Sequence, residues 1–223
     1  MTGGQTWGRR RGRRLSPRRQ FLVDTLLPGL RVVIGEDGKP DHGDGERLWL
    51  EIGFGGGEHL AWQAERHPAV TLIGAEVWLN GVANLLDRVE RHGLANVRIF
   101  DTDVTVLLEA LPPACLERIF VLFPDPWPKA RHRKRRLVNQ AIVARFSDLL
   151  VDGGELRLAT DIEDYALDMK QALEGSKDLQ WSCHRPSDWP ATRYEAKARA
   201  AGREPVFFTG VRRQRLITAP RSR

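Results

Sequence analysis

Short apolar runs and longer amphipathic stretches alternate along most of this chain. The apolar runs predict buried strands, and they cover residues 48–53, 70–76, 97–100, 118–123 and 153–160. Between them, apolar residues recur every three or four positions, which predicts helices over 57–67, 79–92, about 135–150 and 162–173, and a helical turn that ends at Leu111. Two late strands, 179–184 and 205–211, complete the pattern. Such alternation is typical of a parallel α/β sheet with helices on both faces.

Length and composition limit the class of protein. A chain of 223 residues can bury one full hydrophobic core, so we expect a basic and flexible N-terminal arm (1–20), a single domain (21–217) and a short basic tail (218–223). Cys115 and Cys183 are too few for a disulfide framework, and the six histidines share no metal-ligand spacing. No apolar run approaches the roughly 20 residues that cross a bilayer, and no signal peptide precedes the domain. We expect a soluble, cytoplasmic protein without a metal or membrane partner.

The net charge of +6 is distributed unevenly. Residues 1–23 contain seven arginines and no acidic residue, so the remainder of the chain is close to neutral. Such an arm suits a polyanion, because each contacted phosphate releases counterions, although a solubility tail or an organelle presequence would have the same composition. A second basic cluster lies inside the domain and favours nucleic acid as the partner: Lys129, Arg131, Arg133, Lys134, Arg135 and Arg136.

The first predicted strand runs into a glycine-rich turn, EIGFGGGE (51–58). Gly53, Gly55 and Gly57 form G-x-G-x-G at a strand-to-helix turn, where glycine lets the backbone approach a ligand. Glu58 occupies the third glycine position of a dinucleotide fingerprint. Because many tight turns are only structural, the turn alone does not establish a nucleotide site.

Acidic residues gather at the carboxyl ends of the predicted strands. Glu76 is placed to accept both ribose hydroxyls of a nucleoside, and Asp103 lies where the adenine is expected. A pyrophosphate would be repelled here, whereas a ligand with a sulfonium and an ammonium group would be attracted. Each acid alone is compatible with a helix cap or a solvated loop. The whole set favours S-adenosylmethionine over NAD as the cofactor, and it comprises Glu51, Glu58, Glu76, Asp103 and Asp125.

The segment PDPW places Asp125 between two prolines at the end of the fourth strand. The prolines restrict the backbone and hold the carboxylate in one geometry, while Trp127 offers a stacking plane. One carboxylate can accept both N1–H and the N2 amine of guanine, which leaves N7 free to attack a methyl group. Such a transfer depends on positioning more than on a strong base. A pyrimidine C5 methyltransferase would need a cysteine nucleophile, and neither cysteine lies in a suitable motif.

With these motifs, the sequence resembles the bacterial-type tRNA (guanine-N7)-methyltransferases. The resemblance implies a class I methyltransferase fold, with a seven-stranded, mostly parallel sheet whose last strand is antiparallel. It also implies S-adenosylmethionine as the methyl donor and the variable-loop guanosine of tRNA as the target. The resemblance runs from about Leu15 to Arg213 and rests on EIGFGGGE, GAE ending at Glu76, DTDV with Asp103, FPDPWPKARHRKRR (123–136), ATDIEDYA (159–166) and TRYE (192–195). The motif at 123–136 is the most specific of these.

The resemblance also implies roles for individual residues, with Asp125 as the catalytic carboxylate. The implied cofactor-binding residues are Glu51, Gly53, Gly55, Gly57, Glu76, Asp103 and Asp125. The implied substrate contacts are Lys129, Asp161, Thr192, Arg193, Tyr194 and Glu195, with the RNA backbone at Arg131, Arg133, Lys134, Arg135 and Arg136. TRYE also matches a capping box at the start of a helix. Whether Asp125, Asp161 or Glu195 holds the guanine edge stays open, and Pro128 and Gly56 depart from the family pattern.

Two other functions are compatible with the same scaffold. One is a methyltransferase that acts on another RNA base or on a protein amine, and the other is a catalytically silent RNA-binding protein. Retention of the acids at the cofactor positions argues against a silent protein. Both a monomer and a homodimer fit the sequence.

Overall fold

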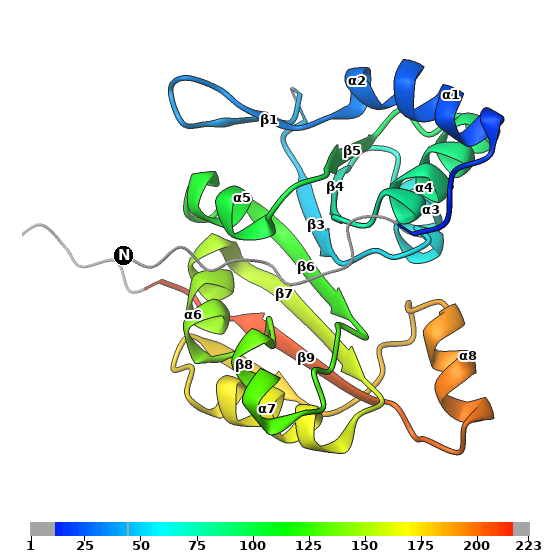
Figure 1. The fold of residues 1–223 in the computed structure, drawn as a ribbon. Helices are drawn as coiled ribbons and strands as arrows, with labels where there is room; N and C mark the ends of the chain where they lie inside the picture. Colours follow the sequence, from blue (N-terminus) through cyan, green and yellow to red (C-terminus); the bar gives the residue numbers. More distant parts are fainter. Residues whose placement is uncertain (1–11, 44, 216–223) are drawn as a thin grey trace, which may run out of the picture.

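The computed structural model describes residues 12–43 and 45–215, which contain a seven-stranded sheet with the strand order β5-β4-β3-β6-β7-β9-β8 (Figure 1). The parallel strands are β3 (Leu48–Ile52), β4 (Thr71–Ala75), β5 (Val97–Phe100), β6 (Leu116–Leu122) and β7 (Leu150–Thr160). The last strand, β9 (Val206–Arg212), inserts between β7 and β8 (Leu179–Ser182) and is antiparallel to both. This confirms the predicted mostly parallel sheet with an antiparallel last strand. A separate short hairpin consists of β1 (Val33–Ile34) and β2 (Pro40–Asp41).

Helices cover both faces of the sheet, as the sequence predicts. One buried cluster joins one face to α5 (Val104–Ala110), α6 (Gln140–Leu149) and α7 (Glu163–Glu174). The other cluster joins the opposite face to α1 (Pro17–Thr25), α2 (Leu27–Leu30), α3 (Glu58–Arg66) and α4 (Leu79–His92). A further helix, α8 (Arg193–Ala200), lies near the carboxyl edge of the parallel strands (Figure 1). In the part of the chain that the structure describes, no helix is both long and apolar enough to cross a membrane.

The strand order creates a switch point between β3 and β6. The chain adds β4 and β5 on one side of β3, and then returns to add β6 and β7 on the other side. The connections that leave the carboxyl ends of β3 and β6 therefore run in opposite directions and leave a crevice between them. The glycine turn follows β3 and the PDPW segment follows β6, so the topology places both at this crevice.

The helix predicted over about 135–150 is wrong in its first part. A 3-10 helix, η1 (Ala130–Arg135), is followed by extended backbone at Arg136, and α6 begins only at Gln140. Asn139 caps α6, because its side-chain oxygen accepts a hydrogen bond of 3.1 Å from the Ile142 N–H. The predicted apolar face still packs into the core, with Val138, Phe146 and Leu149 buried and Ile142 partly buried.

We expect Asn96→Ala to destabilise the fold by about 1–3 kcal/mol. The Asn96 amide nitrogen lies 3.1, 3.0 and 2.8 Å from the carbonyl oxygens of Ala64, His67 and Val70 and so holds the turn between α3 and β4. The free energy of unfolding in urea measures the effect. Gln180→Ala, on the exposed side of β8, serves as the control with an expected change within about 0.5 kcal/mol. An equal effect of the two substitutions would contradict this role of Asn96.

Candidate active site

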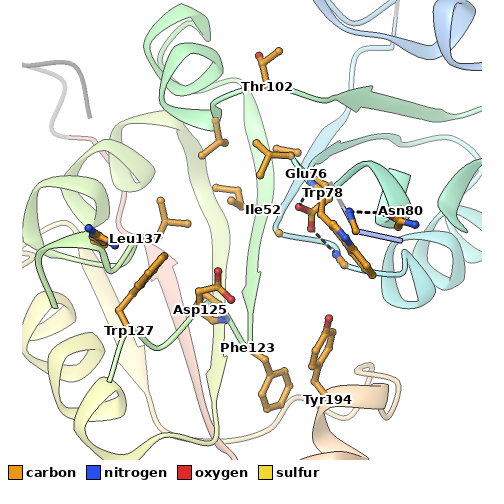
Figure 2. A pocket seen from close by; sticks show the side chains of 18 of the residues that line it. Ile52, Glu76, Trp78, Asn80, Thr102, Phe123, Asp125, Trp127, Leu137 and Tyr194 are labelled. Atoms are coloured by element: carbon orange, nitrogen blue, oxygen red, sulfur yellow. Dashed lines mark hydrogen bonds between the residues drawn. The ribbon is translucent and has the colours of Figure 1, made fainter. Parts of the chain in front are cut away.

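A cleft of about 990 Å³ opens at the carboxyl ends of β3, β4 and β6, at the switch point of the sheet. Its walls come from the glycine turn, the end of β4 and the loop after β6 (Figure 2). Of the residues predicted from the sequence, those that line it are Gly53, Gly55, Glu76, Asp125, Lys134, Arg135, Arg136 and Tyr194. Segments that lie far apart in the sequence are thus brought to one site.

The glycine turn requires glycine for its backbone conformation, and it is closely packed at Gly55 and Gly57. Gly53, Gly55 and Gly57 have positive φ angles of 72°, 56° and 73°. A Cβ atom on Gly81, in the first turn of α4, would lie only 2.2 Å from the carbonyl oxygen of Gly55. A Cβ atom on Gly55 would lie 2.8 Å from the hydroxyl of Tyr194. The turn is therefore held between α4 and α8, with Gly53 and Gly55 on the cleft wall.

Glu76 ties the end of β4 to the glycine turn. Its Oε2 accepts a hydrogen bond of 2.9 Å from the Gly55 N–H, and its Oε1 accepts one of 2.9 Å from the Trp78 N–H. Burial raises the pKa of the Glu76 carboxyl, the backbone N–H groups oppose that rise, and the negative charge of Asp125 adds to it. Figure 2 shows Glu76 and Asp125 on facing walls of the cleft. The cleft thus contains two carboxylates whose charges influence each other.

The loop after β6 holds Asp125 between two strained residues. Phe123 and Trp127 have φ angles of 52° and 43°, a region that bulky side chains rarely occupy and that costs about 1–3 kcal/mol per residue. The Phe123 N–H still donates to the carbonyl oxygen of Ala159 at 2.7 Å, so the strain begins at the edge of the sheet. The Asp125 side chain is accessible from the cleft, but the cleft walls remove part of its water and raise its pKa. The backbone conformation therefore directs this carboxylate into the cleft.

The basic residues of η1 form one rim of the cleft. Arg131 and Lys134 are exposed, and the guanidinium of Arg135 lies 5.0 Å from the ring centre of Trp127. Arg133 is half exposed and forms an ion pair of 2.7 Å with Asp164. Arg136 differs from these four residues, because it is only 4% exposed and its guanidinium points into the protein.

The segment before α1 forms the opposite rim. The Gly12 N–H donates to Oδ1 of Asn80 at 3.0 Å, and Nδ2 of Asn80 donates to the Arg13 carbonyl oxygen at 2.8 Å. This pair of bonds fastens the segment to the start of α4, so that Arg13, Arg14 and Arg19 line the cleft. The arginines at positions 9, 10 and 11 lie outside the described residues. Cations therefore flank the two acidic side chains from both sides.

Comparison with known proteins identifies the family to which this chain belongs. A family model described as "Putative methyltransferase" matches residues 46–208. A tRNA (guanine-N(7)-)-methyltransferase of Rhodospirillum rubrum is 44% identical, covering 94% of this chain and 88% of the relative. One of Paramagnetospirillum magneticum is 45% identical, covering 94% of this chain and 93% of the relative. The chain belongs to the tRNA (guanine-N7)-methyltransferase family.

Solved structures agree with the fold of a methyltransferase. An rRNA methylase from Streptococcus thermophilus superposes with a TM-score of 0.53 at 12% identity, covering 88% of this chain and 95% of that chain. A SAM-dependent O-methyltransferase from Thermotoga maritima gives a TM-score of 0.53 at 14% identity, covering 92% of this chain and 68% of that chain. At these identities the likeness concerns the fold alone, and that fold is the class I methyltransferase fold that the sequence predicts.

Several residues for which the family resemblance implies a role in substrate binding form contacts with other residues of the protein. Oδ2 of Asp161 accepts a hydrogen bond of 2.7 Å from Arg203. Glu195 is 6% exposed, and its carboxylate lies 3.4 Å from Arg185 and 3.5 Å from Arg199. Oγ1 of Thr192 accepts from the Glu195 N–H at 3.0 Å and caps α8, which confirms the predicted helix start, whereas the Glu195 carboxylate pairs with Arg185 and Arg199.

Other such residues lie at or near the cleft. Within TRYE, Tyr194 lines the cleft and stacks on Phe123, with ring centroids 6.3 Å apart. Lys129 is exposed and precedes η1. Oδ1 of Asp103 caps α5 by accepting from the Thr105 N–H at 3.0 Å, while Thr102, Val104 and Thr105 beside it line the cleft. In the described part of the chain, no three His, Cys, Asp or Glu residues are arranged to hold a metal ion.

Sequence reasoning missed the partner of Glu51. This glutamate is 4% exposed, and its Oε2 lies 2.8 Å from Nδ1 of His59, in the first turn of α3. Nε2 of His59 in turn lies 3.1 Å from the side-chain nitrogen of Gln63. Glu51 and His59 line a cavity of about 20 Å³ beside the cleft, which Gly53, Phe123 and Tyr194 also line. The spacing of the histidines in the sequence did not indicate this contact, because His59 pairs with a carboxylate and not with other histidines.

We expect His59→Ala to lower the free energy of unfolding by about 3 kcal/mol, because it leaves the Glu51 carboxylate buried without its partner. The double variant Glu51→Gln/His59→Ala should recover at least about 1 kcal/mol relative to the sum of the single effects. Urea unfolding of the four proteins measures this coupling. His92→Ala, at the exposed end of α4, is the control with an expected change within about 0.5 kcal/mol. Strictly additive effects of Glu51→Gln and His59→Ala would refute the pairing.

Proposed function

We propose that this protein transfers the methyl group of S-adenosylmethionine to N7 of a guanosine in the variable loop of tRNA. The observation that carries the proposal is the facing pair Glu76 and Asp125 in a cleft at the switch point, in a chain 44% identical over most of its length to a named tRNA (guanine-N(7)-)-methyltransferase. The tRNA substrate in turn supports a cytoplasmic location.

The residues of the cleft fit the methyl donor. The cleft volume of about 990 Å³ is sufficient for a nucleoside with an amino-acid chain, and its acidic walls favour a ligand with two positive groups. The Glu76 carboxylate accepts hydrogen bonds from the backbone N–H groups of Gly55 and Trp78, and a carboxylate has about four acceptor positions, so it can also accept from a ribose hydroxyl. Gly53 and Gly55 offer close backbone approach, whereas Glu51, Gly57 and Asp103 support the walls from behind.

The donor supplies an electrophilic methyl group on a sulfonium, so the protein needs to position a nucleophile and does not need to create one. Asp125 accepts hydrogen bonds from N1–H and the N2 amine of the guanine and thereby directs N7 toward the methyl group. Its negative charge also offsets the positive charge that develops on the alkylated base. Trp127 stacks on the base, and Tyr194 closes the cleft over the glycine turn. The strained loop provides this alignment before the substrate arrives.

The contacts favour Asp125 over the two other candidates for the guanine edge. Asp125 lines the cleft, whereas Asp161 pairs with Arg203, Glu195 is enclosed by Arg185 and Arg199, and neither of these two acids lines the cleft. These two residues then support substrate binding by holding α8 and the loop before β9 in place. Arg193 lies 3.8 Å from Glu58 and stands beside Tyr194 on the exposed side of α8.

The two basic rims supply the affinity for tRNA. Arg131, Arg133, Lys134 and Arg135 on one side, with Arg13, Arg14 and Arg19 on the other, can contact phosphates around an extruded guanosine. Drawing a base out of its stack costs roughly a few kcal/mol, which these contacts offset.

The test of this function is a methyl-transfer assay with labelled S-adenosylmethionine and unmodified tRNA, followed by strand cleavage that is specific for N7-methylguanosine. We expect the label at a single variable-loop guanosine. Label at another base or in protein, or no transfer at all, would refute the proposal.

We expect Asp125→Asn to reduce turnover by about 10²- to 10³-fold, because the amide has the shape of the carboxylate but lacks its charge. The dissociation constant for tRNA should change less than about threefold, since the phosphate contacts dominate affinity. Single-turnover methyl transfer and filter binding measure the two quantities. Equal losses of rate and affinity would show that Asp125 serves binding and not the methyl-transfer step.

The raised pKa of Asp125 predicts a pH dependence of activity and stability. Since activity needs the ionised form, kcat/KM should fall on the acid side with a midpoint above the pKa of an ordinary aspartate, about 3.9. The folded-state pKa lies above the unfolded value, so ionised Asp125 destabilises the fold at neutral pH, and this effect disappears below the unfolded pKa. Asp125→Asn should therefore be the more stable protein in urea at pH 7, with a smaller difference near pH 4. A variant less stable than the parent at pH 7 would be inconsistent with burial as the cause.

A further inference from the structure

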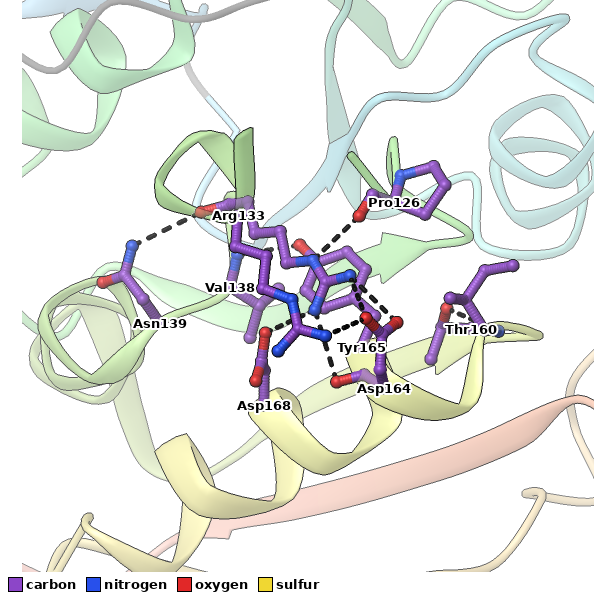
Figure 3. A network of polar contacts seen from close by, with 10 residues as sticks. Pro126, Arg133, Val138, Asn139, Thr160, Asp164, Tyr165 and Asp168 are labelled. Carbon is purple, nitrogen blue, oxygen red and sulfur yellow. Dashed lines mark hydrogen bonds and ion pairs between the residues drawn. The ribbon is translucent and has the colours of Figure 1, made fainter. Parts of the chain in front are cut away.

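Arg136 ends the run of cations in the segment 123–136, but its environment differs from that of its neighbours. The residue is 4% exposed, whereas Arg131, Arg133 and Lys134 are exposed. It lies in the extended stretch between η1 and α6, and this stretch turns its side chain toward α7. Figure 3 shows the residues that receive it, with Asp164, Tyr165 and Asp168 of α7 facing Pro126 and Val138 of the loop.

All three nitrogens of the Arg136 guanidinium donate hydrogen bonds to acceptors within the protein. Nε donates to the carbonyl oxygen of Pro126 at 2.8 Å. Nη2 donates to both carboxylate oxygens of Asp164 at 2.9 Å. Nη1 donates to Oδ2 of Asp168 at 2.5 Å and to the Asp164 carbonyl oxygen at 3.3 Å. Because every nitrogen is engaged within the protein and the residue is buried, its guanidinium is not accessible to a phosphate.

The guanidinium also packs on an aromatic ring that fastens the other end of the loop. It lies 4.7 Å from the ring centre of Tyr165, which is fully buried. The Tyr165 hydroxyl accepts a hydrogen bond of 3.1 Å from the Val138 N–H. The first turns of α7 therefore hold the loop at Arg136 and Val138, and Arg136 extends this hold to Pro126 on the other side of η1.

The Pro126 carbonyl that receives Arg136 directly follows Asp125. Phe123 and Trp127, which flank this pair of residues, have the unfavourable positive φ angles. A strained loop keeps its conformation only when surrounding contacts hold it. The bond from Nε of Arg136 is the contact that reaches the backbone inside this strained stretch.

We propose that Arg136 is a positioning residue for methyl transfer, which holds the Asp125 loop on α7 through Pro126, and that it is not a phosphate contact. The proposal rests on the proposed function, since it concerns the same methyl transfer. The cations of 131–136 then fall into two groups. Arg131, Arg133, Lys134 and Arg135 form an outer set that contacts RNA, and Arg136 is an inner arginine that holds the Asp125 loop. The role requires the planar, five-donor guanidinium, which a lysine ammonium with three donors cannot replace.

The decisive variant is Arg136→Lys, because it keeps the positive charge and removes the fork of donors. We expect single-turnover methyl transfer to fall by about 10²-fold, as a displacement of the reacting groups by about 1 Å would cause. The dissociation constant for tRNA and its dependence on salt should stay within about twofold of the parent. The matched control is Arg131→Ala in the outer set, which should weaken tRNA binding and reduce the slope of log K against log salt by about 0.7–0.9.

A second variant keeps the test informative if Arg136→Lys does not fold. Asp168→Ala removes one acceptor of Arg136 and leaves every cation in place. As a positioning defect, it should lower the transfer rate at least about tenfold without tightening tRNA binding. A phosphate role for Arg136 predicts the opposite, because the loss of a nearby acid would tighten binding and leave the rate unchanged.

Two results would overturn the proposal. The first is Arg136→Lys with the transfer rate of the parent. The second is a reduced salt slope in Arg136→Lys that matches Arg131→Ala. Failure of the proposed function is distinguishable, because the parent protein would then give no N7-methylguanosine, and binding and salt slopes of the variants could still be compared.

Discussion

The carboxylate of Glu76 joins the two halves of the cleft wall that the proposed donor site requires. It accepts one backbone N–H from the glycine turn and one from the segment leading into α4, so β3 and β4 end in a single rigid rim. Burial and the charge of Asp125 both raise the pKa of Glu76, which means that the ionised carboxylate holding this rim is repelled by a second negative charge. A positively charged group bound beside Glu76 and Asp125 reduces this repulsion, so the two carboxylates suit a sulfonium donor.

The opposite wall of the cleft, the loop after β6, depends on a different interaction. The loop after β6 is strained at Phe123 and Trp127, and its shape is maintained by a guanidinium from the far end of the same loop. Charge is therefore arranged in layers: acids lie within the cleft, cations form its rims, and one buried arginine is neutralised by two aspartates behind it. Adjacent basic residues such as Arg135 and Arg136 belong to different layers, because the backbone between η1 and α6 is extended.

The sequence predicted the features that depend on local pattern. The strand and helix periodicities gave the parallel sheet, and the positions of Glu76 and Asp125 just after strands placed both at one edge, since carboxyl ends of parallel strands meet there. The capping box of TRYE likewise identified the start of α8.

What could not be predicted depends on partners that are distant in sequence. Arg136 pairs with residues about 30 positions away, and Asp161 pairs with Arg203 across the connection to β9. Composition showed a uniform run of cations, and only tertiary packing separates the buried one from the exposed ones. The helix boundary failed for the same reason, because amphipathic spacing continues through 136–139 while the anchored side chain holds that stretch extended.

The positive φ angle of Trp127 has a consequence for protein engineering. Glycine adopts this backbone region without strain, so Trp127→Gly would relieve the local strain while giving the unfolded chain more conformational freedom. The same change would remove the aromatic face and loosen the segment that carries Asp125. Relief of backbone strain in this loop would therefore also remove the constraint that orients the carboxylate.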